Sequence, residues 1–244
     1  MNKITSIIAA VNYDDLLDIT LTENKHNFDE TIIITDTKDI KTQQLTKKHN
    51  VKCFVTDIFY INNNKFNRGM AYNAVLSQLK DELDWVLLMD ADVVLEKDFK
   101  NLFFNLNPDK EYFYGCRRYD VQTYEEWIKI KENPELLKKY LLYRGIGYGY
   151  FQLFNFNSSV IKNFINNNNY IIYPPYPTVA EGDWKFRNYW GDYIYEPCPP
   201  DQPLDHYAKE TDHATKLLRE LPFYAIHLGV TGINEYSRKT QRFC

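Results

Sequence analysis

The chain of 244 residues lacks the features that mark membrane, secreted and zinc-binding proteins. No segment approaches the ~20 apolar residues that a helix needs to cross a bilayer. Residues 1–10 contain one lysine and a short apolar run without a cleavage site, so we expect no signal peptide. The four cysteines form no Cys-x-x-Cys pair, which argues against a zinc site or a disulfide framework. We therefore expect a soluble cytoplasmic protein, and peripheral association with a membrane stays open.

A surface for polyanions and a phosphate-binding loop are also missing. The formal net charge is −4 at pH 7, which argues against a nucleic acid as the main partner. The basic pair Arg117 and Arg118 is isolated and typical of a solvated face. The glycines within residues 145–149 lead into no Gly-Lys-Ser/Thr ending, so this segment is a turn and not a phosphate loop.

The first 106 residues alternate between short apolar runs and longer polar segments of helical periodicity. We expect strands at residues 4–11, 30–35, 51–56 and 85–89, and helices at residues 14–25, 39–50, 67–80 and 97–106. Four such alternations predict a parallel α/β sheet with helices on its faces.

After residue 108 this rhythm breaks, and a mixed half follows. We expect strands at residues 112–116, 150–156 and 223–227, and helices at residues 124–131, 158–165 and 205–221. Prolines 174, 175 and 177 predict an extended loop. Because no internal repeat or linker divides the chain, we expect one domain over residues 1–244, with halves 1–106 and 107–244.

Two carboxylates, Asp90 and Asp92, stand one residue apart directly after the apolar strand 85–89. Side chains at i and i+2 of an extended chain point the same way, so the two should converge. At about 5 Å they repel by roughly 3 kcal/mol at an effective dielectric constant of ~20. A divalent cation removes this penalty, and carboxylate oxygens suit Mg²⁺ or Mn²⁺. The alternative is a polar strand end that caps the next helix.

The order of these motifs resembles the GT-A fold of nucleotide-sugar-dependent glycosyltransferases, nearest to the inverting family 2. Residues 9–13 are similar to the end of the family's first strand, and residues 66–73 to the Arg-Gly-x-Ala-x-Asn segment before its Asp-x-Asp motif. The resemblance implies that the donor, a nucleoside-diphosphate sugar with UDP favoured, is bound by Ala10, Val11, Asn12, Asp36, Arg68, Asp90, Ala91 and Asp92.

The resemblance extends to an acidic segment and a histidine in the second half. Residues 180–186 are similar to the segment that supplies the catalytic base, with Asp183 as our first choice and Glu181 as the second. Gly182 separates these two acids, and Asp183 is alternatively the N-cap of a helix that begins at Trp184. His227 resembles the histidine that completes the metal site in some members, and its alternative is a structural histidine.

The implied reaction is metal-dependent transfer of the sugar to a hydroxyl acceptor, a glycan or another compound, with inversion. Asp90, Asp92 and His227 would hold Mn²⁺ or Mg²⁺, which stabilises the charge on the leaving diphosphate. Arg68 would add a fixed cation there. An aspartate, ionised at neutral pH, can take the proton of the acceptor hydroxyl.

Three other readings stay open. A retaining GT-A transferase also uses Asp-x-Asp, although the Lys-Pro-Trp sequence typical of one such family is absent after His227. A nucleotidyltransferase usually carries a glycine-rich loop after its first strand, which residues 11–13 do not offer. A catalytically silent module that binds nucleotides or glycans is the third.

Overall fold

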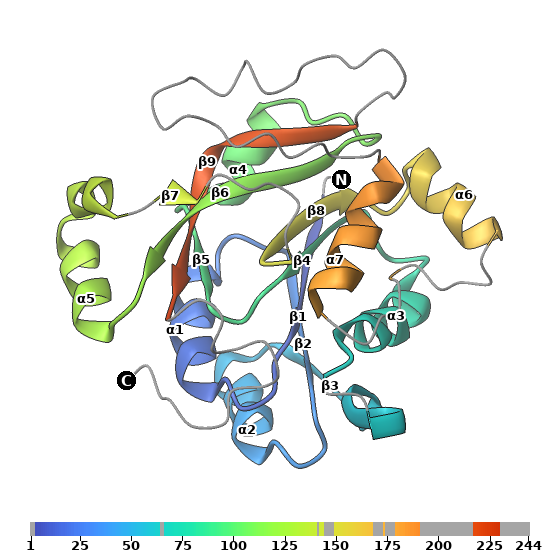
Figure 1. Cartoon of the computed structure of the whole chain (residues 1–244), viewed down its shortest axis with the longest axis horizontal. Helices are drawn as coiled ribbons and strands as arrows, with labels where there is room; N and C mark the ends of the chain where they lie inside the picture. Colours follow the sequence, from blue (N-terminus) through green and yellow to red (C-terminus); the bar gives the residue numbers. More distant parts are fainter. Residues whose placement is uncertain are drawn as a thin grey trace.

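The computed structural model describes residues 3–63, 66–140, 142–143, 149–167, 173, 179–190 and 217–229. The strands among these residues form one nine-stranded sheet in the order β3-β2-β1-β4-β8-β6-β9-β5, with β7 paired to β6 beside this path. Helices flank the sheet (Figure 1). The predicted α/β fold is therefore confirmed.

The first half follows the expected alternation closely. Its elements are β1 (Ile4–Ala9), α1 (Asp14–Asn24), β2 (Glu30–Thr35), α2 (Ile40–His49), β3 (Lys52–Val55), the 3-10 helix η1 (Ile58–Asn63), α3 (Arg68–Leu79) and β4 (Trp85–Met89). β1 pairs in parallel with β2 and β4, and β2 with β3. The carboxyl ends of these four strands therefore meet at one edge of the sheet, where open α/β sheets place their ligands.

The second half is mixed, as expected. Its elements are β5 (Val93–Leu95), α4 (Phe99–Asn105), β6 (Phe113–Val121), α5 (Tyr124–Glu132), η2 (Pro134–Lys139), β7 (Leu142–Tyr143), β8 (Phe151–Asn155), α6 (Ser159–Asn167), α7 (Val179–Arg187), η3 (Asn188–Trp190) and β9 (Leu218–Leu228). β8 is antiparallel to both β4 and β6, and β9 is parallel to β6 and antiparallel to β5.

One predicted helix is wrong where it can be compared. We expected a helix over residues 205–221, but Leu218–Leu221 belongs to β9 and continues into the expected strand at residues 223–227. The pairing of Phe113 with Leu218 and of Tyr114 with Arg219 in the ladder to β6 outweighs the helix-forming residues of this segment. Residues 205–216 and the prolines at 174, 175 and 177 lie outside the described residues.

The acid pair lies where the sheet curls. Residues 90–92 link β4 directly to β5, although β5 stands four places from β4 in the strand order. Strands so far apart in a sheet can be joined by three residues only if the sheet between them bends round. The backbone N–H of Asp90 donates to the carbonyl of Tyr150 at 3.3 Å, and that of Leu228 to the carbonyl of Asp92 at 2.8 Å. The fold thus fixes both ends of the Asp-x-Asp segment.

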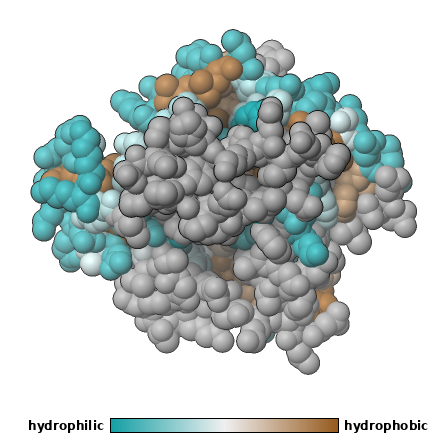
Figure 2. Space-filling model, turned by 45° about the horizontal axis from the view of Figure 1, so that its top comes forward, coloured by the Kyte–Doolittle hydropathy of each residue, from teal (hydrophilic) through white to brown (hydrophobic). Residues whose placement is uncertain are grey.

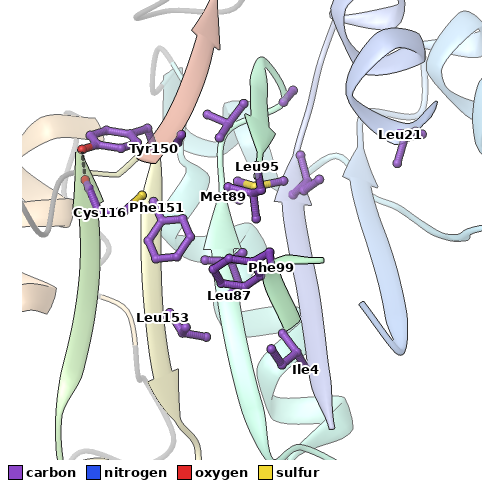
Figure 3. Packing of buried hydrophobic residues seen from close by; sticks show 14 of the residues in the cluster. Ile4, Leu21, Leu87, Met89, Leu95, Phe99, Cys116, Tyr150, Phe151 and Leu153 are labelled. Atoms are coloured by element: carbon purple, nitrogen blue, oxygen red, sulfur yellow. Dashed lines mark hydrogen bonds between the residues drawn. The ribbon is translucent and has the colours of Figure 1, made fainter. Parts of the chain in front are cut away.

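Two apolar clusters cover the two faces of the sheet. On β4, Trp85, Leu87 and Met89 point into the cluster with α1 and α4, shown in Figure 3. The alternate residues Val86 and Leu88 point into the cluster with α3, α6 and α7. Burial on both faces explains why β4 reads as a continuous apolar run.

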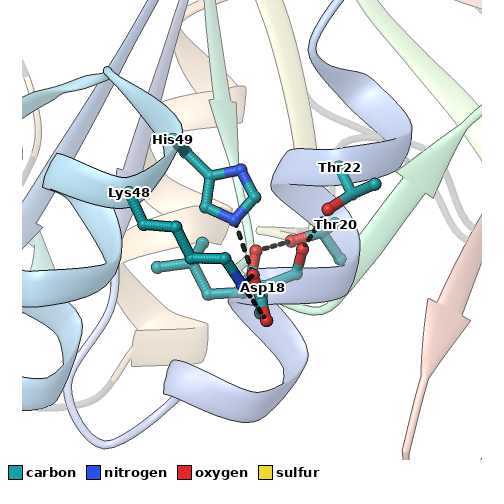
Figure 4. Close-up of polar contacts among 6 residues, drawn as sticks. Asp18, Thr20, Thr22, Lys48 and His49 are labelled. Atoms are coloured by element: carbon teal, nitrogen blue, oxygen red, sulfur yellow. Dashed lines mark hydrogen bonds and ion pairs between the residues drawn. The ribbon is translucent and has the colours of Figure 1, made fainter.

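Polar side chains fasten α1 to its neighbours. Lys48 and His49, at the end of α2, approach the carboxylate of Asp18 to 2.8 and 2.6 Å (Figure 4). Partial burial raises the pKa of Asp18, but these two partners outweigh it and hold the pKa below its ordinary value. Asn24 donates to the carbonyl of Val93 at 2.8 Å and accepts from the N–H of Leu95 at 2.9 Å, which ties α1 to β5 next to the acid pair.

The described surface carries no membrane-spanning element. Among the residues that the structure describes, no helix is long and apolar enough to cross a bilayer. The lobe around α5 is mainly hydrophilic in the space-filling view of Figure 2. This agrees with the sequence of α5, in which the acids Glu125 and Glu126 begin the helix and Lys129 and Lys131 lie in its last turn.

Candidate active site

The end of β1 is held rigidly beside the end of β2. Asn12 adopts a left-handed φ of 62°, and its backbone N–H donates to Oδ2 of Asp39 at 2.7 Å. The same carboxylate accepts from the hydroxyl of Thr35 at 3.2 Å and caps α2 through the N–H of Thr42 at 3.1 Å. One buried aspartate thus fixes both loops, and no sequence motif singles out Asp39.

Three further residues predicted to bind the nucleotide are each held by a hydrogen bond of their own. The N–H of Ala10 donates to the carbonyl of Ile34 at 2.8 Å, which holds the end of β1 against β2. Asp36 is buried, and its Oδ1 accepts from the N–H of Lys38 at 2.8 Å, so it also forms the turn that follows β2. The carbonyl of Ala91 accepts from the hydroxyl of Thr20 at 2.8 Å.

Arg68 joins two acids that the sequence assigned to different tasks. It begins α3 directly after the cap Asn67, whose Oδ1 accepts from the N–H of Met70 at 3.0 Å. Its side chain is 6% exposed, and its guanidinium contacts Oδ1 of Asp90 through Nη1 and Oδ1 of Asp183 through Nη2. Burial lowers the pKa of Arg68, but the two carboxylates outweigh it and raise the pKa well above its ordinary value. The group is therefore a permanent cation between the two acids.

Asp183 lies inside α7 and does not cap it. The helix begins at Val179, so the alternative that Asp183 is an N-cap is wrong. Oδ1 of Asp183 also accepts a hydrogen bond from the hydroxyl of Tyr173. The backbone of Gly149 packs against this carboxylate, because a Cβ at position 149 would meet Oδ2 and Cγ of Asp183 and Nη2 of Arg68. The side chain of Glu181 lies outside the described residues.

A row of alternating charges runs from Asp92 through β9 to β6. Nε2 of His227 lies 3.4 Å from Oδ2 of Asp92, and its Nδ1 lies 3.2 Å from Oδ1 of Asp120. Nε of Arg118 lies 3.0 Å from the same oxygen of Asp120, and its guanidinium stacks on the ring of Tyr150 at 4.7 Å. Burial lowers the pKa of His227, but the two aspartates outweigh it and raise the pKa to about 9.

These surroundings shift the pKa values of Asp90 and Asp92 in opposite directions. Partial burial raises the pKa of Asp90 against the pull of Arg68. Burial also acts to raise the pKa of Asp92, but His227 outweighs it and the pKa falls below its ordinary value. Asp90 therefore faces Arg68, whereas Asp92 faces His227. Asp120 was missed because its role depends on pairing between β6 and β9.

The oxygen and nitrogen atoms of Asp90, Asp92 and His227 are of the kinds that bind a hard divalent cation, although they do not form a complete coordination shell. Carboxylate oxygens and an imidazole nitrogen suit Mn²⁺ and Mg²⁺. Within the described ranges, however, no group of three His, Cys, Asp or Glu side chains stands ready to hold a metal ion. Asp92 and His227 are adjacent, while the carboxylate of Asp90 is turned to Arg68. A cation here would need further ligands, such as the phosphate oxygens that commonly complete Mg²⁺ sites.

The aromatic residues near α7 serve the core. An aromatic face such as that of Trp190 can stack on a sugar ring, but Trp190 is 1% exposed and packs against Phe113, Phe154 and Phe186. The side chains of Tyr148 and Trp184 lie outside the described residues.

Comparison with known families fits this geometry. The model of glycosyl transferase family 2 matches residues 5–169, about two thirds of the chain. The chain belongs to glycosyl transferase family 2. The prediction of a family 2 member with the GT-A fold is therefore confirmed. No curated protein matches this family 2 chain significantly.

Solved structures resemble the chain at low identity. A mycobacterial protein shares 13% identity at a TM-score of 0.41, over 63% of this chain and 53% of that one. A 4-diphosphocytidyl-2C-methyl-D-erythritol synthase from Anaerococcus prevotii shares 14% at 0.42, over 68% and 77%. Glucosyl-3-phosphoglycerate synthase from Mycobacterium tuberculosis, in complex with Mn²⁺, UDP and glucosyl-3-phosphoglycerate, shares 10% at 0.47, over 93% and 71%. The chain thus spans about half the length of the first of these proteins.

Proposed function

We propose that this family 2 protein transfers a sugar from a nucleoside-diphosphate sugar to a hydroxyl acceptor, with inversion and with the help of a divalent metal. The observation that carries the proposal is the bridge made by Arg68 between Asp90 and Asp183. It brings an acid of the Asp-x-Asp motif and the candidate base to one cation. A reaction that expels a diphosphate and deprotonates an attacking hydroxyl needs these two kinds of group close together.

The donor would lie along the carboxyl ends of β1, β2 and β4. The fixed backbone of residues 10–12 and the buried Asp36 offer hydrogen-bonding groups to the nucleoside. Arg68, at the N-terminus of α3, supplies a permanent positive charge to the diphosphate. UDP is the favoured nucleotide because it is the commonest donor among similar transferases.

Asp92 and His227, together with Asp90 at the other end of the Asp-x-Asp segment, would hold Mn²⁺ or Mg²⁺. When bound, such an ion neutralises the negative charge that grows on the leaving diphosphate. Asp120 orients His227 by lying against Nδ1, which leaves Nε2 directed at Asp92. Arg118, in contact with Asp120 and stacked on Tyr150, fixes Asp120 in turn.

Asp183 would take the proton of the acceptor hydroxyl as the hydroxyl oxygen attacks the anomeric carbon. Its place on α7 and its contact with Arg68 put it next to the proposed diphosphate site. Glu181 is the second candidate base, as in the sequence-based prediction. The acceptor is a glycan or another hydroxyl compound.

The test is donor hydrolysis, in which water replaces the unknown acceptor. The protein is incubated with a panel of UDP- and GDP-sugars, with and without Mn²⁺, and the released nucleoside diphosphate is measured. We expect slow, metal-dependent release from one donor and a loss of about 10²-fold or more in Asp92→Ala. The control is Asp81→Ala, an exposed acid beyond the end of α3, which should behave as wild type.

Two other results would contradict this proposal. Nucleotide binding without cleavage of any donor would favour a silent binding module. Equal release from wild type and Asp92→Ala would show that the Asp-x-Asp motif does not serve the reaction.

Metal uptake should be coupled to proton release. Because the pKa of His227 is raised to about 9, its imidazole is protonated at neutral pH and must lose a proton to bind a metal. We expect about one proton released per Mn²⁺ bound at pH 7, measured by calorimetry in buffers of different ionisation enthalpy. Below pH 9 the affinity for Mn²⁺ should rise by about tenfold per pH unit. His227→Gln should abolish this dependence, and a pH dependence unchanged in His227→Gln would exclude the histidine as a ligand.

A further inference from the structure

The two oxygens of the Asp183 carboxylate have different surroundings. Oδ1 accepts from Nη2 of Arg68 and from the hydroxyl of Tyr173. Oδ2 takes neither of these two hydrogen bonds and lies against the backbone of Gly149, where a Cβ would overlap it. Asp183 is 7% exposed, so its side chain is enclosed on most sides.

Tyr173 is itself held in place by Asn73 of α3. Nδ2 of Asn73 donates to the carbonyl of Tyr173 at 2.6 Å, and its Oδ1 accepts from the N–H of Tyr173 at 2.7 Å. The ring of Tyr173 packs between Tyr72, at a centroid distance of 5.4 Å, and Phe186, at 4.8 Å. Burial raises the pKa of Tyr173 well above its ordinary value, so the phenol keeps its proton as a donor. These contacts fix the hydroxyl before any substrate binds.

We propose that Tyr173, anchored by Asn73, is a positioning residue that fixes Oδ1 of Asp183 and leaves Oδ2 to receive the proton of the acceptor. This inference rests on the proposed function and deepens it. In the step it serves, the acceptor O–H bond breaks and its proton passes to Oδ2. The acceptor oxygen then bonds to the anomeric carbon, and the diphosphate leaves with the electron pair of the broken C–O bond. Arg68 and Tyr173 hold the carboxylate so that it does not turn away during this transfer.

The test separates turnover from binding. In Tyr173→Phe we expect kcat for hydrolysis of the preferred donor to fall by about 10- to 100-fold, the effect of losing one hydrogen bond to a charged group. The Kd for UDP in the presence of Mn²⁺ should stay unchanged, because Tyr173 contacts the base and not the proposed donor site. The matched control is Tyr114→Phe, which removes a buried hydroxyl that donates to the carbonyl of Asp109 at 3.1 Å, and its kcat should equal that of wild type.

A double-mutant cycle shows whether Asn73 acts through Tyr173. Asn73→Ala should lower kcat in the wild type but have no further effect in Tyr173→Phe. Asn27→Ala is the control, since Asn27 makes the same two-point contact with Glu96 and Phe99 at 3.2 and 3.0 Å, away from Asp183. Circular dichroism verifies that each variant is folded.

The outcomes separate this inference from the proposed function. A wild-type kcat in Tyr173→Phe, or independent effects of the two changes, would overturn the positioning role while Asp183 stays the base. Full turnover in Asp183→Asn would overturn the base assignment and this inference together. Failure of the wild type to cleave any donor would overturn the proposed function itself.

Discussion

Asp183→Asn is expected to lower kcat for donor hydrolysis by about 10²- to 10⁴-fold, the usual contribution of a general base. An amide can still accept from Arg68 and Tyr173 at Oδ1, so the geometry of the site should survive. The amide cannot take a proton, and only the chemical step should suffer. Released UDP measures turnover, and calorimetric titration with UDP and Mn²⁺ should give a wild-type Kd.

Glu181→Gln is the matched comparison, because Glu181 is the second candidate and lies on the same helix. If Asp183 is the base, Glu181→Gln should keep most of its turnover. The reverse pattern, with loss in Glu181→Gln alone, would move the base to Glu181. Equal and small losses in both variants would argue for a retaining reaction or another base.

The first half of the fold could be predicted because its patterns are local. The β-branched run at residues 30–35 and the apolar run at residues 85–89 match β2 and β4 residue for residue. Both strands contribute side chains to the apolar clusters on the two faces of the sheet, which gives them the apolar runs that mark them as strands. The helix predicted at residues 205–221 was wrong at its end, because pairing with β6 depends on a strand about a hundred residues away.

The helix of Asp183 shows a similar limit. The alternative interpretation made Asp183 the N-cap of a helix that begins at Trp184. The helix instead begins at Val179 and includes Gly182, which costs about 0.5–1 kcal/mol relative to alanine. The packing of Phe186 against Tyr173 and Phe154 supplies apolar contact that the local sequence does not reveal.

Within the site, the sequence revealed the acids but not their partners. Arg68, Asp90, Asp92 and Asp183 were marked by motifs, and the structure brings Arg68 together with two of these acids. Asn73 and Tyr173 carry no such signal as a pair, because they are 100 positions apart. Arg118 and Asp120 are two residues apart on β6, so their side chains point to the same face and an ion pair between them could be expected. Only the pairing of β6 with β9 brings His227 to them.

The largest loss of stability is expected for Arg68→Met. Methionine fills much of the same space but leaves the carboxylates of Asp90 and Asp183 without their shared cation. Removing one partner of a buried ion pair costs about 3–5 kcal/mol. Asp183, with 10% of its side chain exposed, should carry more of this cost than Asp90, with 33%. Urea unfolding of the metal-free protein at pH 8 measures the change in the free energy of unfolding.

Two comparisons identify the charge as the cause. The triple variant Arg68→Met/Asp90→Asn/Asp183→Asn should regain most of the loss, because it has no unpaired charge left to bury.

The destabilisation by Arg68→Met should also be smaller at pH 5 than at pH 8. Partial burial already raises the pKa of Asp90 in the presence of Arg68, and loss of the cation raises it further. An acid whose pKa is higher in the folded state than in the unfolded state destabilises the fold as the pH rises through that pKa. A loss below about 1 kcal/mol at pH 8, within the range of an exposed ion pair, would show that water reaches these carboxylates and that the bridge does not organise the site.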